Sequence, residues 1–155
     1  MAAIYRLTRS QLITRPLPEV FAFFSAAENL EAITPAFLRF RIATPLPIEM
    51  RAGARIDYTL SLWGLPMRWR TKITLWEPNV RFVDEQESGP YTLWQHSHEF
   101  EALANGTRMR DRVDYQLPLG PFGSLAHALV VRRSLDAIFD YRRRAIAERF
   151  GEIPE

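Results

Sequence analysis

Hydrophobic and polar residues alternate with a period of two through most of the chain between residues 37 and 117. Because successive side chains of a β-strand point to opposite faces, this alternation predicts strands that each bury one face. Clusters of proline and glycine divide the region into short runs. The six runs are FLRFRIAT (37–44), ARIDYTLSLW (54–63), MRWRTKITLWE (67–77), VRFVDEQE (80–87), YTLWQHSHEFEA (91–102) and TRMRDRVDYQLPL (107–119). Six consecutive strands with short connections predict an antiparallel meander.

Three further segments flank this meander. Residues 4–13 lack proline and glycine and predict a first strand. Residues 15–35 predict two short helices, the first beginning near Pro18 and the second ending before Pro35. Residues 121–150 predict one helix of about 45 Å. Its most apolar stripe runs through Ala128, Val131, Leu135, Ile138 and Phe139, and then Arg142 and Ala145.

This order of elements predicts an α+β fold in which residues 1–155 form one domain. A seven-stranded antiparallel sheet of this size curls, and the long C-terminal helix can close its concave face. The two short helices follow the first strand. A curved sheet wrapped around one helix predicts a cavity between the two.

The stretch TLWQHSHEF, residues 92–100, contains two of the three histidines of the chain. On a strand, His96 and His98 point to the same face as Trp94 and Phe100. The alternation of the other strands predicts which side chains join them on the concave face. The polar side chains predicted there are Tyr58, Thr71, His96, His98, Asp111 and Tyr115.

The dipeptide Asn105-Gly106 is typical of two-residue hairpin turns. We therefore predict that it joins the histidine strand to residues 107–119. In that register Asp111 lies opposite Phe100 and is a diagonal neighbour of His98.

Four interpretations of His96, His98 and Asp111 are open at this stage. They can orient the polar groups of a ligand, or they can form a purely structural hydrogen-bond network. The two histidines, with Cα atoms about 7 Å apart, can also share a zinc ion if a third ligand such as Asp111 approaches. A histidine beside an aspartate can finally act as a general acid or base. We assign no catalytic residue, and we predict neither a metal nor another cofactor.

Composition narrows the classes of function. The chain has no cysteine, which excludes thiolate chemistry, and its net charge is only +2. Six arginines lie between residues 132 and 149, and we interpret the cluster Arg142, Arg143 and Arg144 as a solvated helix face rather than a nucleic-acid site. The chain has no signal-peptide pattern and no run of about 18 apolar residues. These features predict a cytoplasmic protein with no nucleic-acid partner and no stable membrane insertion, as a monomer or a dimer.

The chain resembles the START-like, helix-grip (SRPBCC) superfamily, and within it the bacterial cyclase/dehydrase-type ligand-binding proteins. The resemblance covers nearly the whole chain. It rests on the order of elements, on the arginine-rich C-terminal helix, and on the stretches RPLPEVFAFFSAAENLEAITP, GARIDYTL, RWRTKITLWEPNVRFVDEQ and GPYTLWQHSHEFE. It implies a curved antiparallel sheet that grips the C-terminal helix around a hydrophobic cavity. It assigns no catalytic role to His96, His98 or Asp111.

The resulting functional prediction is the binding of a hydrophobic small molecule, such as a lipid, a quinone or a polyketide-like compound. The predicted ligand-binding residues are Tyr58, Leu60, Trp69, Thr71, Trp94, His96, His98, Phe100, Asp111, Tyr115, Val131 and Leu135. One alternative is a polyketide cyclase or dehydratase that uses a cavity histidine as acid and base. Another is a non-catalytic interaction domain whose cavity is filled by its own side chains. The prediction leans toward a protein that is not an enzyme.

Overall fold

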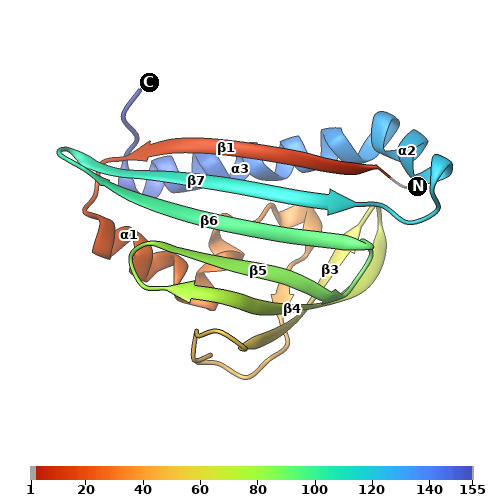
Figure 1. The fold of residues 1–155 in the computed structure, drawn as a ribbon, viewed down its shortest axis with the longest axis horizontal. Helices are drawn as coiled ribbons and strands as arrows, with labels where there is room; N and C mark the ends of the chain where they lie inside the picture. Colours follow the sequence, from red (N-terminus) through yellow and green to blue (C-terminus); the bar gives the residue numbers. More distant parts are fainter. Residues whose placement is uncertain (1–2, 155) are drawn as a thin grey trace.

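The computed structural model describes residues 3–154 and confirms the predicted helix-grip architecture (Figure 1). The strands are β1 (Ile4–Ile13), β2 (Arg41–Ile42), β3 (Arg55–Leu62), β4 (Leu65–Glu77), β5 (Arg81–Ser88), β6 (Leu93–Leu103) and β7 (Gly106–Gln116). Between β1 and β2 lie the helix α1 (Leu17–Phe24) and the 3-10 helices η1 (Ala27–Ile33) and η2 (Ala36–Leu38). The C-terminal helix consists of α2 (Pro121–Ala126), the π-helical turn η3 (His127–Val131) and α3 (Arg132–Phe150).

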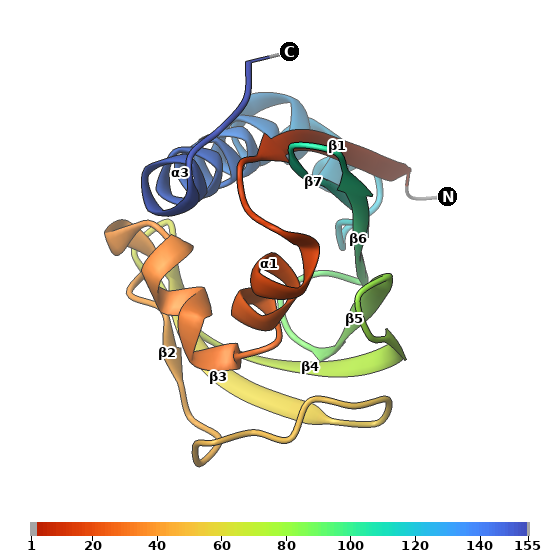
Figure 2. The same cartoon turned by 90° about the vertical axis from the view of Figure 1, so that its left-hand side faces the viewer.

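The seven strands form one sheet in the order β1-β7-β6-β5-β4-β3-β2, and all neighbours are antiparallel. The meander therefore runs from β2 to β7, and β1 adds to its last strand. Two register shifts between β4 and β5 mark irregular pairing, which bends a sheet. Figure 2 shows the result, a sheet that curls from β1 and β7 beside α3 around to β3 and β2 on the opposite side.

The first predicted strand of the meander, residues 37–44, is wrong for most of its length. Arg41 and Ile42 form a two-residue strand beside β3, and Ala43 and Thr44 only donate irregular hydrogen bonds to the carbonyl of Asp57. The residues before this strand form η2, and Arg39 adopts a positive φ of 48° that a strand does not accommodate. The run FLRFRIAT is therefore mainly a connection that leads from the short helices to the sheet edge.

The C-terminal helix runs along the concave face of the sheet, and its predicted apolar stripe is confirmed from Val131 onward, whereas Ala128 is exposed. The side chains of α3 that are buried recur every three or four residues, as expected for one face of a helix. They are Leu135, Phe139, Arg142, Ile146 and Phe150. The end of this helix is tied to β1, because the backbone N–H of Thr14 donates to the carbonyl of Gly151 at 3.2 Å.

The hairpin between β6 and β7 differs from the predicted register by two residues. The turn consists of Ala104 and Asn105, so Leu103 pairs with Gly106. Gly106 is the first residue of β7, where a Cβ atom would overlap the carbonyl oxygen of Ile13. The glycine thus serves the close approach of the chain after β1 rather than the turn. As a consequence Asp111 pairs directly with His98 and not with Phe100.

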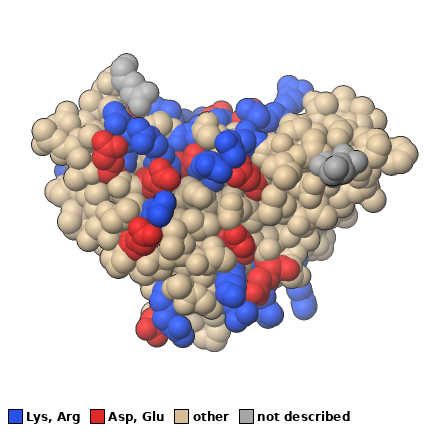
Figure 3. All heavy atoms as spheres, in the orientation of Figure 1, with Lys and Arg blue, Asp and Glu red and all other residues tan. Residues whose placement is uncertain are grey.

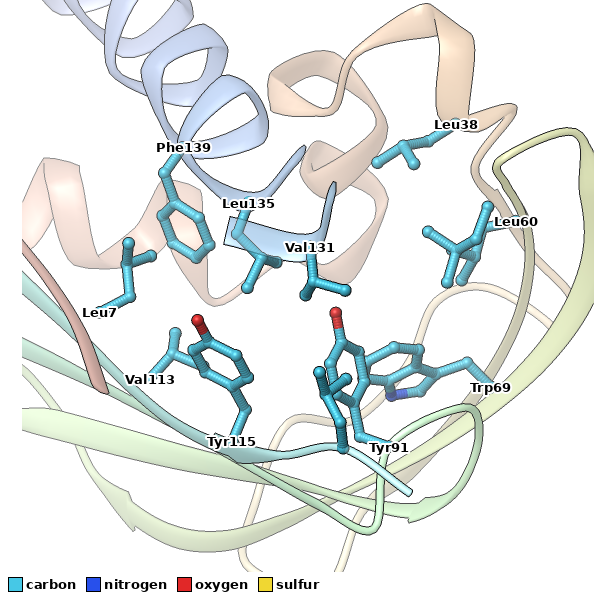
Figure 4. Packing of buried hydrophobic residues seen from close by; sticks show 12 residues of the cluster. Leu7, Leu38, Leu60, Trp69, Tyr91, Val113, Tyr115, Val131, Leu135 and Phe139 are labelled. Carbon is cyan, nitrogen blue, oxygen red and sulfur yellow. The ribbon is translucent and has the colours of Figure 1, made fainter. Parts of the chain in front are cut away.

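Two clusters of apolar side chains fill the space between sheet and helices. The first lies under the N-terminal half of the C-terminal helix and includes Trp69, Tyr115 and Leu135 (Figure 4). The second lies around α1 and includes Phe21, Phe82 and Phe100. The inward faces that the alternation predicts for β3, β4 and β7 are confirmed by this packing as far as Ile73 of β4. Beyond the register shift between Ile73 and Leu75, Trp76 packs in the second cluster. The buried members of the three faces are Ile56, Leu60, Leu62, Trp69, Thr71, Ile73, Met109, Asp111, Val113 and Tyr115.

The surface carries charges of both signs. On the face drawn in Figure 3 the basic and acidic side chains are interspersed. Many form ion pairs on the outer face of the sheet, such as Arg6 with Asp114 at 2.7 Å and Arg70 with Asp57 at 2.7 Å. None of the helices between residues 3 and 154 combines the length and the apolar character that a membrane span requires.

Candidate functional site

A cavity of about 180 Å³ lies between the concave face of the sheet and the C-terminal helix. Its walls come from the short helices, from β3 to β6 and from α3. Most of the lining is apolar. The interior of a folded protein is normally close-packed, with few voids larger than a water molecule. A mostly apolar cavity with a few polar groups in its lining is typical of a small-molecule site.

Aromatic side chains form one wall of the cavity. Trp69 lies at its centre, with its ring stacked on that of Tyr58 at 5.8 Å between centroids. The ring of Trp94 meets Trp69 edge-on at 5.3 Å, and Tyr91 lies 5.7 Å away (Figure 4 shows Trp69 and Tyr91). These contacts hold the rings in fixed orientations, so the wall presents a preformed aromatic surface.

The other part of the site is a polar cluster that consists of Asp84, His96, His98, Asp111 and Arg142. Nε2 of His96 lies 2.8 Å from Oδ1 of Asp111, and Nε2 of His98 lies 2.7 Å from Oδ2 of Asp84. Nη2 of Arg142 lies 3.3 Å from Oδ1 of Asp111 and 3.4 Å from Nδ1 of His98. The two imidazole rings stack with their centroids 3.7 Å apart.

Strand register and helix periodicity bring this polar cluster together. His96 pairs with Asp84 of β5, and His98 pairs with Asp111 of β7, so three neighbouring strands contribute. Arg142 comes from the opposite side, because it lies seven residues after Leu135 on the buried stripe of α3. The side chain of Arg142 is only 10% exposed, and Asp111 is 9% exposed.

The contacts of His98 determine its protonation. Arg142 carries only hydrogen-bond donors, so Nδ1 of His98 must accept and Nε2 must carry the proton that is donated to Asp84. Oδ1 of Asp111 also lies 3.5 Å from Nδ1 of His98, and its charge favours a protonated ring. Its effect on the pKa of His98 is smaller than that of burial. Burial, together with the adjacent His96, lowers the pKa of His98 to about 4. His98 is therefore neutral at neutral pH.

Both carboxylates of the polar cluster are ionised. Burial by itself raises the pKa of Asp111, but the charge of Arg142 and the hydrogen bond from His96 outweigh it and hold this pKa well below its usual range. The same balance applies to Asp84. There the hydrogen bond from His98 is the main contribution that lowers the pKa.

The twelve predicted ligand-binding residues divide into two groups. Eight line the cavity. They are Tyr58, Leu60, Trp69, Thr71, Trp94, His96, His98 and Leu135. Four are buried beside it instead. Tyr115 and Val131 pack in the first apolar cluster, Phe100 packs in the second, and Asp111 lies behind His96 and His98.

Two members of the polar cluster are not among the predicted residues. The interpretation of Arg142 as part of a solvated face is wrong, because Arg142 is buried. The sequence feature that indicates its burial is its position on the apolar stripe of the helix. Asp84 is the second, and its signal is its position two residues after Phe82, on the inward face of β5. The third histidine, His127, lies outside the cluster and stacks on Tyr5 with centroids 3.5 Å apart.

The polar cluster also has the residue types of a metal site. Among residues 3–154, ligand atoms of Asp84, His96 and His98 lie within 4.8 Å of one another. The third ligand would then be Asp84 rather than Asp111. A cation there would have to displace the hydrogen bond between His98 and Asp84, and it would lie close to the guanidinium of Arg142, which repels it. The observed contacts therefore favour a hydrogen-bonded cluster over a metal centre.

The sequence matches the family described as "Polyketide cyclase / dehydrase and lipid transport" over residues 13–145. The chain belongs to this family, which lies within the START-like helix-grip superfamily. No curated protein matches the sequence.

Solved structures with the same fold are numerous and distant in sequence. TTHA0849 from Thermus thermophilus has a TM-score of 0.66 at 20% identity, with 95% of this chain and 96% of that chain covered. CV1439 from Chromobacterium violaceum has a TM-score of 0.70 at 12% identity, with 99% of both chains covered. A norcoclaurine synthase mutant from Thalictrum flavum has a TM-score of 0.66 at 13% identity, with 96% of this chain and 98% of that chain covered. At such identities the likeness concerns the fold.

We predict that Arg142→Met lowers the free energy of unfolding by about 3 kcal/mol or more, because it leaves the buried carboxylate of Asp111 without its cation. Arg143→Met is the matched control, since Arg143 is 43% exposed and pairs with Glu152 at the surface; we expect a loss below about 1 kcal/mol. Urea denaturation of the two variants measures both values. Equal losses would show that Arg142 behaves as a surface residue.

We also predict that the ring of His98 stays neutral until the pH approaches 4. Between that value and the ordinary histidine pKa of about 6.5, the unfolded chain binds a proton that the native protein does not. The free energy of unfolding therefore falls as the pH is lowered through this range, by about 3 kcal/mol at most.

Histidine ring NMR spectra, recorded as a function of pH, measure the protonation of His98 directly. The free energy of unfolding should be measured in the variant His127→Gln. Partial burial also lowers the pKa of His127, so this residue would add its own loss of stability as the pH is lowered. A His98 signal that titrates near pH ~6.5 would contradict the assignment.

Proposed function

We propose that the protein binds a hydrophobic small molecule, such as a lipid, a quinone or a polyketide-like compound, in the cavity between sheet and helix. The observation that carries the proposal is the cavity itself, with its aromatic wall and its polar cluster at one part of the lining. Removing apolar ligand surface from water supplies the driving force, at about 25 cal/mol per Å². The polar cluster would then orient the ligand.

The family supports this proposal, because both polyketide cyclisation and lipid transport concern largely hydrophobic molecules. The norcoclaurine synthase mutant was solved in complex with a transition-state analogue, so a protein of this fold accommodates a small organic molecule. The alternative of an interaction domain with a filled interior has less support, because the side chains enclose a cavity of about 180 Å³. We expect binding to take place in the cytoplasm, within a single domain, without a cofactor and without a nucleic-acid partner.

A second candidate function is acid–base catalysis of a cyclisation or dehydration. The observation in its favour is the hydrogen bond between Nε2 of His96 and Asp111, which leaves Nδ1 of a cavity histidine as the basic nitrogen. Aldol cyclisation of 2,6-heptanedione to 3-methylcyclohexenone, with loss of water, is a suitable model reaction. The catalytic function requires that the protein accelerate it and that His96→Gln remove the acceleration. A rate equal to that of buffer would exclude this activity.

We predict that the neutral fluorescent probe N-phenyl-1-naphthylamine binds with one molecule per chain, with a blue-shifted and stronger emission. Leu60→Trp should weaken binding at least about tenfold, because the larger side chain takes up cavity volume. Thr59→Trp is the matched control, since the neighbouring residue is exposed on the outer face of β3. Fluorescence titration measures all three affinities.

Two outcomes would contradict the proposal. In the first, no concentration of the probe saturates the wild-type protein. In the second, both tryptophan variants bind the probe as tightly as the wild type does, which would show that the probe occupies a surface site and not the cavity.

A further inference from the structure

Asp84 has one carboxylate oxygen that lacks a good hydrogen-bond donor. Oδ2 accepts from His98 at 2.7 Å. The donor nearest to Oδ1 is the hydroxyl of Thr71 at 3.4 Å, and this hydroxyl lies closer, at 3.1 Å, to the carbonyl oxygen of Glu85. A hydroxyl has a single proton, so Thr71 divides it between these two oxygens, and Oδ1 receives only the longer and weaker hydrogen bond.

The position of Asp84 makes this deficit relevant to ligands. Asp84 lines the cavity, and its side chain is only 18% exposed. An ionised carboxylate removed from water is costly unless its oxygens accept hydrogen bonds. A donor that enters the cavity can therefore gain a charge-assisted hydrogen bond at Oδ1.

The charges around the cavity decide which kind of donor fits. Asp84 and Arg142 are the charged residues of the described lining, and Asp111 lies directly behind them. Two carboxylates and one guanidinium leave a net negative charge when both histidines are neutral, and no net charge when one is protonated. Arg142 already contacts Asp111 and His98. The site thus offers Oδ1 of Asp84 as an acceptor with only one long hydrogen bond, and the guanidinium of the lining is already paired with a carboxylate. Nε of Arg142 and Nε1 of Trp69 are buried donors without a hydrogen-bond partner among the described residues, so a group that both donates and accepts, such as a hydroxyl, suits the site.

We propose that the bound molecule carries an uncharged hydroxyl group that donates to Oδ1 of Asp84, so that the cavity selects phenols and alcohols over carboxylic acids. This inference rests on the proposed binding function and specifies its ligand class. The aromatic rings of Trp69, Trp94 and Tyr58 contact the apolar part of such a molecule. Asp84 is then the residue that determines specificity for the polar end.

Three naphthalene derivatives test the inference, because they share one apolar body. The hydroxyl of 2-naphthol can donate, the ether of 2-methoxynaphthalene can only accept, and 2-naphthoate is anionic at neutral pH. We expect 2-naphthol to bind at least about tenfold more tightly than the ether, in line with a hydrogen bond to a charged group. We expect 2-naphthoate to bind more weakly than the ether. Isothermal titration calorimetry measures the three affinities.

The variant Asp84→Asn links the preference to the residue. It removes the charge at nearly constant shape, so the ratio of the 2-naphthol and ether affinities should fall to about threefold or less. Asp57→Asn is the matched control, because Asp57 pairs with Arg70 on the outer face of the sheet, and it should keep the wild-type ratio. Circular dichroism verifies that both variants are folded, and the comparison of ligands in the wild type does not depend on either.

The outcomes separate this inference from the proposed function. Equal affinities for 2-naphthol and the ether, tightest binding of 2-naphthoate, or an unchanged ratio in Asp84→Asn would overturn the role of Asp84 while the cavity remains a binding site. Binding of N-phenyl-1-naphthylamine without any binding of 2-naphthol would have the same meaning. Failure of every one of these molecules to bind would overturn both.

Discussion

The ion pair between Arg142 and Asp111 connects the C-terminal helix to the sheet at the centre of the molecule. A guanidinium that lies on the buried stripe of a helix requires an acceptor, and Asp111 provides it from β7 at 3.3 Å. Breaking such a pair leaves an uncompensated buried charge, which costs several kcal/mol. This contact therefore restricts the rotation of α3 about its axis, together with the hydrogen bonds that join the helix to β1, such as that from Gln11 to the carbonyl of Arg143. Residues of α3 that precede Arg142 on the same stripe, Leu135 and Phe139, form part of the cavity lining.

The same ion pair lies where the two apolar clusters meet. The guanidinium of Arg142 lies 5.3 Å from the ring of Phe24, in the second cluster, and 5.9 Å from that of Phe139, in the first. His98 stacks on Phe82, and His96 packs against Phe139. The polar cluster is thus enclosed by aromatic rings, which strengthens its electrostatic interactions. One part of the cavity lining is consequently polar, while the aromatic wall around Trp69 offers an apolar surface.

The fold could be predicted from the sequence because the residue patterns that indicate its strands and helices are local and repeated along the chain. Period-two alternation and the regular turns predicted the strands, except for most of the run 37–44, and the apolar stripe within residues 121–150 predicted the helix. The cavity position of His96 and His98 followed from the same alternation. The exact partners did not, because they depend on register: Gly106 fits a close approach to Ile13, and this moved Asp111 opposite His98. The prediction for Arg142 is wrong because its neighbours Arg143 and Arg144 suggest a solvated run, whereas only its helical position reveals burial.

The central claim, that a hydrophobic molecule occupies the cavity, is tested most directly by the indole N–H signals of the four tryptophans. Trp69 and Trp94 line the cavity, Trp76 packs in the second apolar cluster, and Trp63 is exposed in the turn between β3 and β4. A titration with N-phenyl-1-naphthylamine, followed by ¹H–¹⁵N NMR, should shift the signals of Trp69 and Trp94 and leave that of Trp63 in place. A shift confined to Trp63, or no shift at saturating probe, would contradict the account.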